Sequence, residues 1–160
     1  MSKEIIWQPS KELVNNSKLT KFLRFCKVKD YDELENKSSS KPEWLWENVI
    51  KFSNLKFFKS YNKIMDESKG IPWTKWCVGG KTNLVLNCID RHKDKDFFKK
   101  TFIFAEREDG KESSITYDEF DKKISKVGNT LKVNGFQKGD VIALYMPQFI
   151  ETYIAYFAIL

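Results

Sequence analysis

Apolar residues recur every three or four positions in the first third of the chain, a spacing typical of short amphipathic helices. One helix is predicted after the cap-forming residues 15–17, with an apolar face made of Leu19, Phe22, Leu23 and Cys26. A second short helical turn is predicted around Tyr31 and Leu34, ending in the serines at 38–40. A third helix starts at Pro42, since a first helical position tolerates a missing N–H, and its apolar stripe is Leu45, Trp46, Val49 and Ile50.

The helical pattern then stops and returns only near residue 82. Gly70-Ile71-Pro72-Trp73 is a cluster of helix breakers, so we predict irregular chain from Asp66 to Gly80. Thr82 is predicted to cap a further helix, which carries Leu84, Val85, Cys88 and Ile89.

Beyond Lys100 the pattern changes to short runs of β-forming residues. Residues 101–105 and 114–117 are predicted to form a hairpin around a turn at 108–111. Thr116 and Glu119 give T-x-x-E, the capping-box pattern, before a helix whose apolar face is Phe120, Ile124, Val127 and Leu131. Gly135 is placed to end that helix, because glycine adopts the left-handed conformation without strain.

The last elements predict the opening of a doubly wound α/β domain. Residues 141–146, Val-Ile-Ala-Leu-Tyr-Met, read as a nearly continuous buried strand that ends at Pro147, and a final helix starts near Phe149. That helix is still apolar at Leu160, and a parallel sheet with only its first strands has open edges. We therefore expect the polypeptide to stop before its fold is complete.

Composition narrows the class of protein without indicating a chemistry. The chain of 160 residues is 41% hydrophobic and 31% charged, which excludes a disordered tail. The N-terminus has no signal-peptide pattern, and the stretch 149–160 is shorter than the ~20 residues that span a bilayer, so we expect a soluble cytoplasmic protein without a membrane partner. The net charge is +6, but only three of the 28 cationic residues are arginines, so we expect no nucleic-acid partner. The weaker alternative is that the lysines bind nucleic acid, and a steep loss of nucleic-acid affinity with rising salt would support it.

Potential metal ligands are few. Cys26, Cys77 and Cys88 lie far apart, and His92 is the only histidine, so a zinc site is not expected. The thiols are interpreted as small buried hydrophobes in a reducing compartment.

Several short motifs have a functional and a structural interpretation, and the structural one is favoured for each. Gly79-Gly80 before Thr82 could approach a phosphate, but no complete phosphate-loop pattern is present, so a turn is favoured. Asp90-Arg91-His92 could act together, but consecutive helical residues do not share a face, so a helix-end ion pair is favoured. Trp73 and Trp76 are interpreted as loop anchors rather than stacking platforms.

Two charged runs are interpreted as solvated surface. The first is a linker that holds Lys93, Asp94, Lys95, Asp96, Lys99 and Lys100. The second is the exposed side of the helix after Thr116, with Asp118, Glu119, Asp121, Lys122 and Lys123.

Three stretches together resemble the N-terminal part of AMP-forming acyl-CoA synthetases, in the acetyl-CoA synthetase branch. The first is Ile6 to Ser10 with Asn16 to Thr20, and the third runs from Thr116 to Pro147. The middle stretch is the most specific and is similar to the family pattern W-x-x-G-G-x-x-N-x-x-x-N-C-x-D-R-H, with Trp76, Gly79, Gly80, Asn83, Asn87, Cys88, Asp90, Arg91 and His92. Cys77 stands where the family usually has an aromatic residue, and Gly128 where alanine is common.

The resemblance implies an α/β fold with a helical and irregular N-terminal extension at 1–92, followed at 93–160 by the first strands and helices of an incomplete adenylate-forming domain. It implies an acetate–CoA ligase-like enzyme that uses ATP, Mg and CoA and a short-chain carboxylate. The family's phosphate loop, acyl pocket and catalytic lysine have no matching position here, so no catalytic, cofactor-binding or metal-binding residue is assigned. We expect the chain alone to be inactive and to bind no cofactor. The alternative is a non-catalytic module that pairs with a separately encoded remainder of the ligase.

Overall fold

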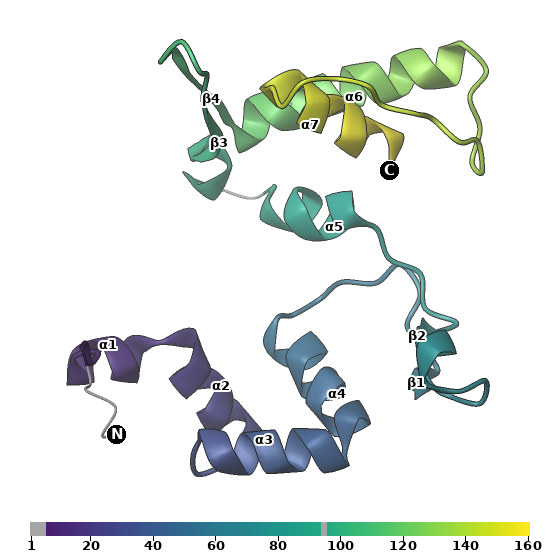
Figure 1. Ribbon diagram of the computed structural model, residues 1–160. Helices are drawn as coiled ribbons and strands as arrows, with labels where there is room; N and C mark the ends of the chain where they lie inside the picture. Colours follow the sequence, from purple (N-terminus) through teal and green to yellow (C-terminus); the bar gives the residue numbers. More distant parts are fainter. Residues whose placement is uncertain (1–5, 94–95) are drawn as a thin grey trace. The chain divides into compact units, whose positions relative to one another are not determined.

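The computed structural model describes residues 6–93 and 96–160 and divides the chain into two compact units. Unit 1 comprises the residues up to Leu55 together with Lys59–Gly80, and unit 2 comprises Lys56–Phe58 together with Lys81–Leu160. The elements of each unit are drawn in Figure 1.

Unit 1 begins with four helices, of which the last three are predicted by its sequence. They are α1 (Lys11–Asn16), which was not predicted, α2 (Lys18–Cys26), α3 (Tyr31–Ser40) and α4 (Pro42–Phe52). The Ser17 side chain accepts a hydrogen bond from the backbone N–H of Thr20, which satisfies a free donor at the start of α2. Cys26, Val28 and Leu34 form a small buried core, against which Phe22, Leu23, Trp44 and Leu45 pack.

A two-stranded sheet completes unit 1 and corrects the prediction of irregular chain from Asp66 to Gly80. Strand β1 (Lys63–Asp66) pairs antiparallel with β2 (Lys75–Val78), so that Met65 lies opposite Trp76. A single turn of 3-10 helix, η1 (Ile71–Trp73), lies in the connection between them. The four residues of β2 are too few to show a period by themselves, and the strand exists because β1 supplies its hydrogen-bonding partners.

Unit 2 packs a hairpin and three α-helices around one core. Its elements are α5 (Leu84–Cys88), the 3-10 turns η2 (Asp90–His92) and η3 (Asp96–Lys99), the strands β3 (Thr101–Glu106) and β4 (Glu112–Thr116), and the helices α6 (Tyr117–Val133) and α7 (Ile150–Ile159). Phe120 and Ile89 are fully buried, and the core around them contains Ile115, Ile124, Ile150 and Ile154. Helix α7 lies alongside α6 (Figure 1). Within the described residues, no helix combines the length and apolarity needed to cross a bilayer.

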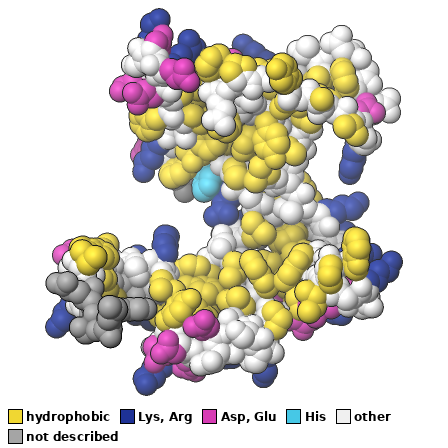
Figure 2. Space-filling view, viewed as in Figure 1, with side chains coloured by type: hydrophobic (Ala, Val, Ile, Leu, Met, Phe, Trp, Pro, Cys, Tyr) yellow, Lys and Arg dark blue, Asp and Glu magenta, His cyan; other side chains and the backbone are white. Residues whose placement is uncertain are grey.

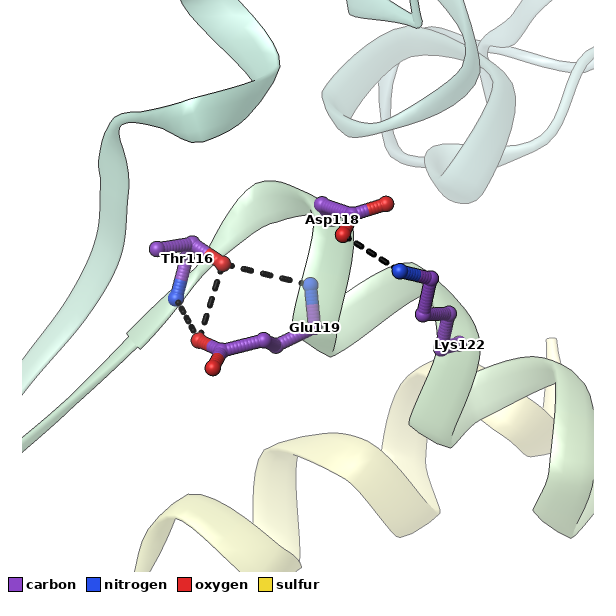
Figure 3. A network of polar contacts seen from close by, with 4 residues as sticks. All are labelled: Thr116, Asp118, Glu119 and Lys122. Atoms are coloured by element: carbon purple, nitrogen blue, oxygen red, sulfur yellow. Dashed lines mark hydrogen bonds and ion pairs between the residues drawn. The ribbon is translucent and has the colours of Figure 1, made fainter.

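The capping box predicted at the start of α6 is confirmed (Figure 3). The backbone N–H of Glu119 donates to the Thr116 hydroxyl over 3.2 Å, and the Thr116 N–H donates to the Glu119 carboxylate over 3.0 Å. The Thr116 N–H and the Thr116 hydroxyl both donate to the Glu119 carboxylate, and these two bonds hold the pKa of Glu119 below its usual value. The two residues therefore satisfy two free donors and define the first residue of α6.

Replacing Thr116 with alanine is expected to lower the free energy of unfolding of unit 2 by about 1–2 kcal/mol, the usual effect of losing an N-cap. The measurement is unfolding by denaturant, monitored through the hydrogen exchange of the α6 amides. Thr130→Ala is the matched control, because that hydroxyl donates only to the Lys126 carbonyl within α6 and alanine is the better helix former. Equal losses in the two variants would contradict the capping role.

The predicted buried strand at 141–146 is wrong for the described structure. Val141 is 95% exposed, Tyr145 is fully exposed, and the two sheets of the described chain, β1–β2 and β3–β4, do not include this segment. Both sheets are antiparallel, so the parallel pairing of a doubly wound domain is not seen among the described residues. The reason is that an apolar strand is buried only where neighbouring strands pair with it and helices cover the faces of the sheet.

Candidate functional site

The polar contacts of unit 2 concentrate on the segment from Asn83 to Lys93, which includes α5 and η2. The sequence predicts no catalytic residue here, so the question is what its side chains hold together. Four of them carry most of the contacts: Asn83, Asn87, Asp90 and Lys93.

Asn83 contacts the beginning of one helix and the end of another. Its Oδ1 accepts a hydrogen bond from the Val85 N–H over 2.6 Å and caps α5. Its Nδ2 donates to the Leu160 carbonyl over 2.6 Å, at the end of α7. The prediction that Thr82 caps this helix is therefore wrong, because the Thr82 hydroxyl donates to the Lys56 carbonyl over 2.7 Å.

Asn87 fixes the segment Lys56–Phe58 to α5. Its Oδ1 accepts from the Lys56 N–H over 2.8 Å, and its Nδ2 donates to the Lys56 carbonyl over 3.0 Å and the Thr82 hydroxyl oxygen over 2.9 Å. The Phe58 N–H adds a backbone bond to the Lys81 carbonyl over 2.8 Å. One carboxamide thus pairs with both backbone polar groups of Lys56, which an apolar side chain could not do.

Lys93 bridges η2 and α6. Its Nζ lies 2.8 Å from an Asp90 oxygen and 3.0 Å from an Asp121 oxygen. The hydrogen bond to Asp90, followed by that to Asp121, raises the pKa of Lys93 and keeps it protonated. Lys93 is exposed, as the interpretation as solvated linker expected, but it also forms two ion pairs that the interpretation did not include.

The rest of that predicted linker is only partly described. Asp94 and Lys95 lie outside the described residues. Residues 96–99 form η3, and Phe97 packs its ring on His92 with the centroids 4.7 Å apart. Asp96, Lys99 and Lys100 are exposed, as predicted, but residues 96–99 form a helical turn rather than irregular linker.

The structure does not bring Asp90, Arg91 and His92 together as a reactive triplet. Asp90 does form an ion pair at this helix end, but its partner is Lys93, a residue outside the triplet. The His92 ring contacts Phe97 and lies 6.0 Å from the Tyr117 ring, between centroids. Burial, followed by the positive charge of Arg91, lowers the pKa of His92.

The lowered pKa predicts that unit 2 loses stability in acid through His92. The folded state disfavours the imidazolium, so this contribution is complete above the ordinary pKa of about 6.5 and is lost as the pH falls toward the lower folded value. His92 is the only histidine, so its ring proton resonances report this titration directly. A folded-state midpoint at or above that of a histidine peptide would contradict the prediction, and His92→Gln should flatten the stability profile in this pH range.

The glycine pair forms a turn at the end of β2, as the structural interpretation expected. Gly79 has a φ of 77°, and a Cβ built there would lie 3.1 Å from Asn62 Nδ2. The Gly80 N–H donates to the Cys77 carbonyl over 2.9 Å. The positive φ and the close Asn62 side chain explain the glycine at 79 without a phosphate.

The two tryptophans of this region differ in their surroundings. Trp76 packs edge-on against Trp46 with centroids 5.4 Å apart, which confirms it as an anchor, whereas Trp73 is 70% exposed and is not anchored in unit 1. Trp46 and Trp76 line an apolar groove of about 420 Å³ together with Ile50 and Cys77. Hydrophobic side chains cover much of the visible face of each unit (Figure 2).

The remaining candidates have structural partners as well. Cys26 is buried as predicted, but Cys77 and Cys88 are only half-buried, and burial raises the pKa of the Cys26 and Cys77 thiols. On α6, Lys122 pairs with Asp118 over 2.6 Å, so the predicted solvated face carries defined contacts. Among residues 6–93 and 96–160, no three His, Cys, Asp or Glu side chains gather where they could hold a metal ion.

Sequence reasoning missed the two asparagines as structural residues. Asn83 is the N-cap of α5, and asparagine just before an apolar helical run was a usable signal for that role. The hydrogen bond from Asn83 to the Leu160 carbonyl, however, joins residues 77 positions apart, so local spacing could not predict it.

Two family models match consecutive parts of the chain. The model described as "Acetyl-coenzyme A synthetase N-terminus" matches residues 31–88, and the model described as "AMP-binding enzyme" matches residues 88–160. The boundary predicted between residues 92 and 93 stays a prediction.

Curated relatives agree with these matches. The chain is 31% identical to acetyl-coenzyme A synthetase of Leptospira biflexa over 97% of this chain and 22% of that protein. It is 33% identical to that of Methanothrix soehngenii over 96% of this chain and 23% of the relative, and 34% identical to that of Helicobacter pylori strain G27 over 89% and 22%. The chain therefore spans between a fifth and a quarter of the length of these relatives.

A solved structure shares the fold. The acetoacetyl-CoA synthetase from Streptomyces lividans superposes with a TM-score of 0.86 over 98% of this chain and 25% of that one, at 16% identity. This match confirms the predicted fold class, a helical N-terminal part followed by the beginning of an adenylate-forming domain. The two consecutive family matches and the curated relatives together show that the chain belongs to the AMP-forming acyl-CoA synthetases and corresponds to their N-terminal region.

Proposed function

We propose that this chain is the N-terminal part of an acetate–CoA ligase that forms an acyl-adenylate. The observation that carries the proposal is the order of the two family matches, from the acetyl-coenzyme A synthetase N-terminus at 31–88 to the AMP-binding enzyme at 88–160. The complete enzyme would join a short-chain carboxylate to the α-phosphate of ATP and release pyrophosphate. It would then transfer the acyl group to the thiol of CoA, with AMP as the leaving group. Such an enzyme would work in the cytoplasm, where ATP and CoA are available.

The described residues do not fit a site for Mg or ATP. Adenylation needs positive charge and backbone donors at the phosphates and a bound metal ion. The carboxylates of Asp90 and Asp121 are paired with Lys93, and Asn62 lies close to the Gly79 turn. We therefore propose that residues 1–160 bind no cofactor by themselves and that ATP, Mg and CoA are held by later parts of the enzyme.

We propose a structural role for unit 1, in which its aromatic side chains cover one side of the enzyme's adenylate-forming domain. The exposed Trp73 and the apolar groove lined by Trp46 and Trp76 support this role. Exposed apolar patches of this kind are typical of surfaces that meet another protein part.

Two assays test the proposal. Purified residues 1–160 should give no acetate-dependent exchange between pyrophosphate and ATP above background, and measurable exchange would overturn the proposed inactivity. A chimera in which residues 1–160 replace the matching part of the Methanothrix soehngenii relative should retain that exchange. A folded chimera without activity, measured beside the unmodified relative, would count against the ligase assignment.

The second candidate function is a non-catalytic module that completes a separately encoded remainder of the ligase. The exposed segment Val141–Met146 favours it, because an apolar stretch with unpaired backbone groups can accept another strand. Co-expression with a relative's remaining residues as a separate chain should give a stable complex. Failure to co-purify, with both chains folded, would leave only the continuous enzyme.

A further inference from the structure

We propose that residues 6–29, here called the basic segment, bind an anionic membrane surface. The segment contains α1, α2 and the chain on either side of them, drawn in purple in Figure 1. This role goes beyond the proposed ligase function and does not depend on it. It revises the expectation of no membrane partner, since that expectation considered only spanning and targeting stretches.

The basic segment holds almost all of the net charge of the chain. It has six cationic side chains and one carboxylate, that of Glu12, so it carries +5 of a total of +6. The other 136 residues are nearly balanced, with 22 cationic and 21 acidic side chains. Among the described residues, only Lys29 of the six cations forms an ion pair, with Asp30 at 3.7 Å. The segment is therefore a concentrated and largely uncompensated positive charge.

Helix stability does not explain where two of these cations lie. Lys11 and Lys18 are the first residues of α1 and α2, where the positive end of the helix dipole disfavours a cation. The first turn of α2 has no acidic residue that would offset Lys18. Arg24, in contrast, lies in the last turn, where a cation is favourable. An anionic partner outside the helices would remove the unfavourable contribution of the two lysines.

The cations of α2 lie away from the core of unit 1. The α2 residues that belong to that core or pack on it are Phe22, Leu23 and Cys26. Lys18, Lys21 and Arg24 recur at intervals of three on the other side of the helix, and all three are exposed. Packing within unit 1 thus leaves this charged side free to meet a surface.

Exposed apolar side chains accompany the cations in the same segment. No residue of α1 is buried, and Leu13 is 54% exposed. Trp7, just before α1, is 70% exposed. The Thr20 hydroxyl donates to the Val14 carbonyl over 2.6 Å, which ties α2 to α1. Tryptophan and leucine next to lysines suit a lipid surface, where apolar groups enter the interface and cations meet the headgroups.

The composition favours lipid over nucleic acid as the anionic partner. Arg24 is the only arginine among the six cations, and arginine is the side chain whose planar fork best matches nucleic acid. Aliphatic side chains such as Leu13 and Val14 gain from entering a bilayer interface but find no apolar partner on a phosphate backbone. The cytoplasmic leaflet is anionic, so this binding agrees with the proposed cytoplasmic enzyme.

The test is sedimentation of the 160-residue chain with lipid vesicles. The chain should bind vesicles of equal parts phosphatidylserine and phosphatidylcholine at low salt, and its affinity should fall as salt rises. Phosphatidylcholine alone should bind roughly tenfold more weakly or less. The triple variant Lys18→Gln, Lys21→Gln, Arg24→Gln should lose roughly a hundredfold in affinity, since each cation near an anionic surface strengthens binding about fivefold. Trp7→Ala with Leu13→Ala should lose about tenfold at unchanged charge.

The matched control removes three positive charges from the exposed side of α6, by Lys123→Gln, Lys126→Gln and Lys132→Gln. It has the same net charge as the first triple variant and should bind vesicles within about twofold of the unmodified chain. Equal losses in the two triple variants would overturn the proposal. Should a variant fail to fold, the salt and lipid dependence of the unmodified chain decides the question.

Two further results would assign the basic segment to another partner. Binding to duplex DNA without binding to the anionic vesicles would assign it to nucleic acid and overturn the proposal. The folded chimera with the Methanothrix soehngenii relative should also bind the vesicles. Binding by the 160-residue chain but not by the chimera would show that the remainder of the enzyme covers the segment, which overturns the proposal as well.

Discussion

Replacing Phe120 with alanine is expected to lower the free energy of unfolding of unit 2 by about 3–5 kcal/mol. Phe120 is completely buried, and its ring lies between those of Phe102 and Phe157, with centroids 4.8 and 5.3 Å away. Removing the ring leaves a cavity where β3, α6 and α7 meet, and both the lost burial and the cavity are unfavourable. Since small domains are stable by only about 5–15 kcal/mol, this loss is a large part of the total.

The measurement has to report on unit 2 alone. All five tryptophans lie between residues 7 and 76, so tryptophan fluorescence follows unit 1. Hydrogen exchange of α6 and α7 against denaturant concentration is therefore the suitable measurement. Phe104→Ala is the matched control, because it deletes the same kind of ring from a position on β3 that is 81% exposed. Similar losses in the two variants would contradict the core assignment.

Leu34→Ala is expected to lower the free energy of unfolding of unit 1 by about 2–5 kcal/mol. Leu34 is 7% exposed and shares its cluster with Cys26 and Val28. The cluster is small, so each of its side chains supplies a large share of the burial that holds α2, α3 and α4 together.

Tryptophan fluorescence suits this second measurement, because Trp44 packs against the same cluster. Leu13→Ala is the control: Leu13 is also helical but 54% exposed, and alanine is an equally good helix former. An urea midpoint for Leu34→Ala that matches the control would show that the cluster does not stabilise unit 1.

Helices and the hairpin were predictable because their signals are local. The capping box of Thr116 and Glu119 acts over three residues, and the apolar face through Phe120 and Ile124 follows the helical period. The prolines and serines that begin the N-terminal helices act over similar distances. Such interactions need no knowledge of the rest of the chain, so a pattern in the sequence is enough to find them.

Errors arose where a residue's environment depends on distant partners. Strand β2 was missed because its partner β1 lies about ten residues earlier and has no marked pattern of its own. Residues 141–146 were assigned to a buried strand from composition, yet composition cannot show whether neighbouring strands are present. The ion pair of Lys93 with Asp121 was not predicted, because Asp121 lies 28 positions away.

The spacing of apolar residues, the cap residues and the turn residues thus predicted the helices and the hairpin. The motif that contains Asn83 and Asn87 indicated the resemblance to a family. The chain's long-range contacts determined the roles of the signature residues: Asn83 joins two helix ends, Lys93 bridges two carboxylates, and His92 packs among aromatic rings. The physical reason is that local signals depend on neighbours fixed by covalent geometry. Hydrogen-bond partners and burial, in contrast, depend on which distant segments the folded chain brings within a few ångströms.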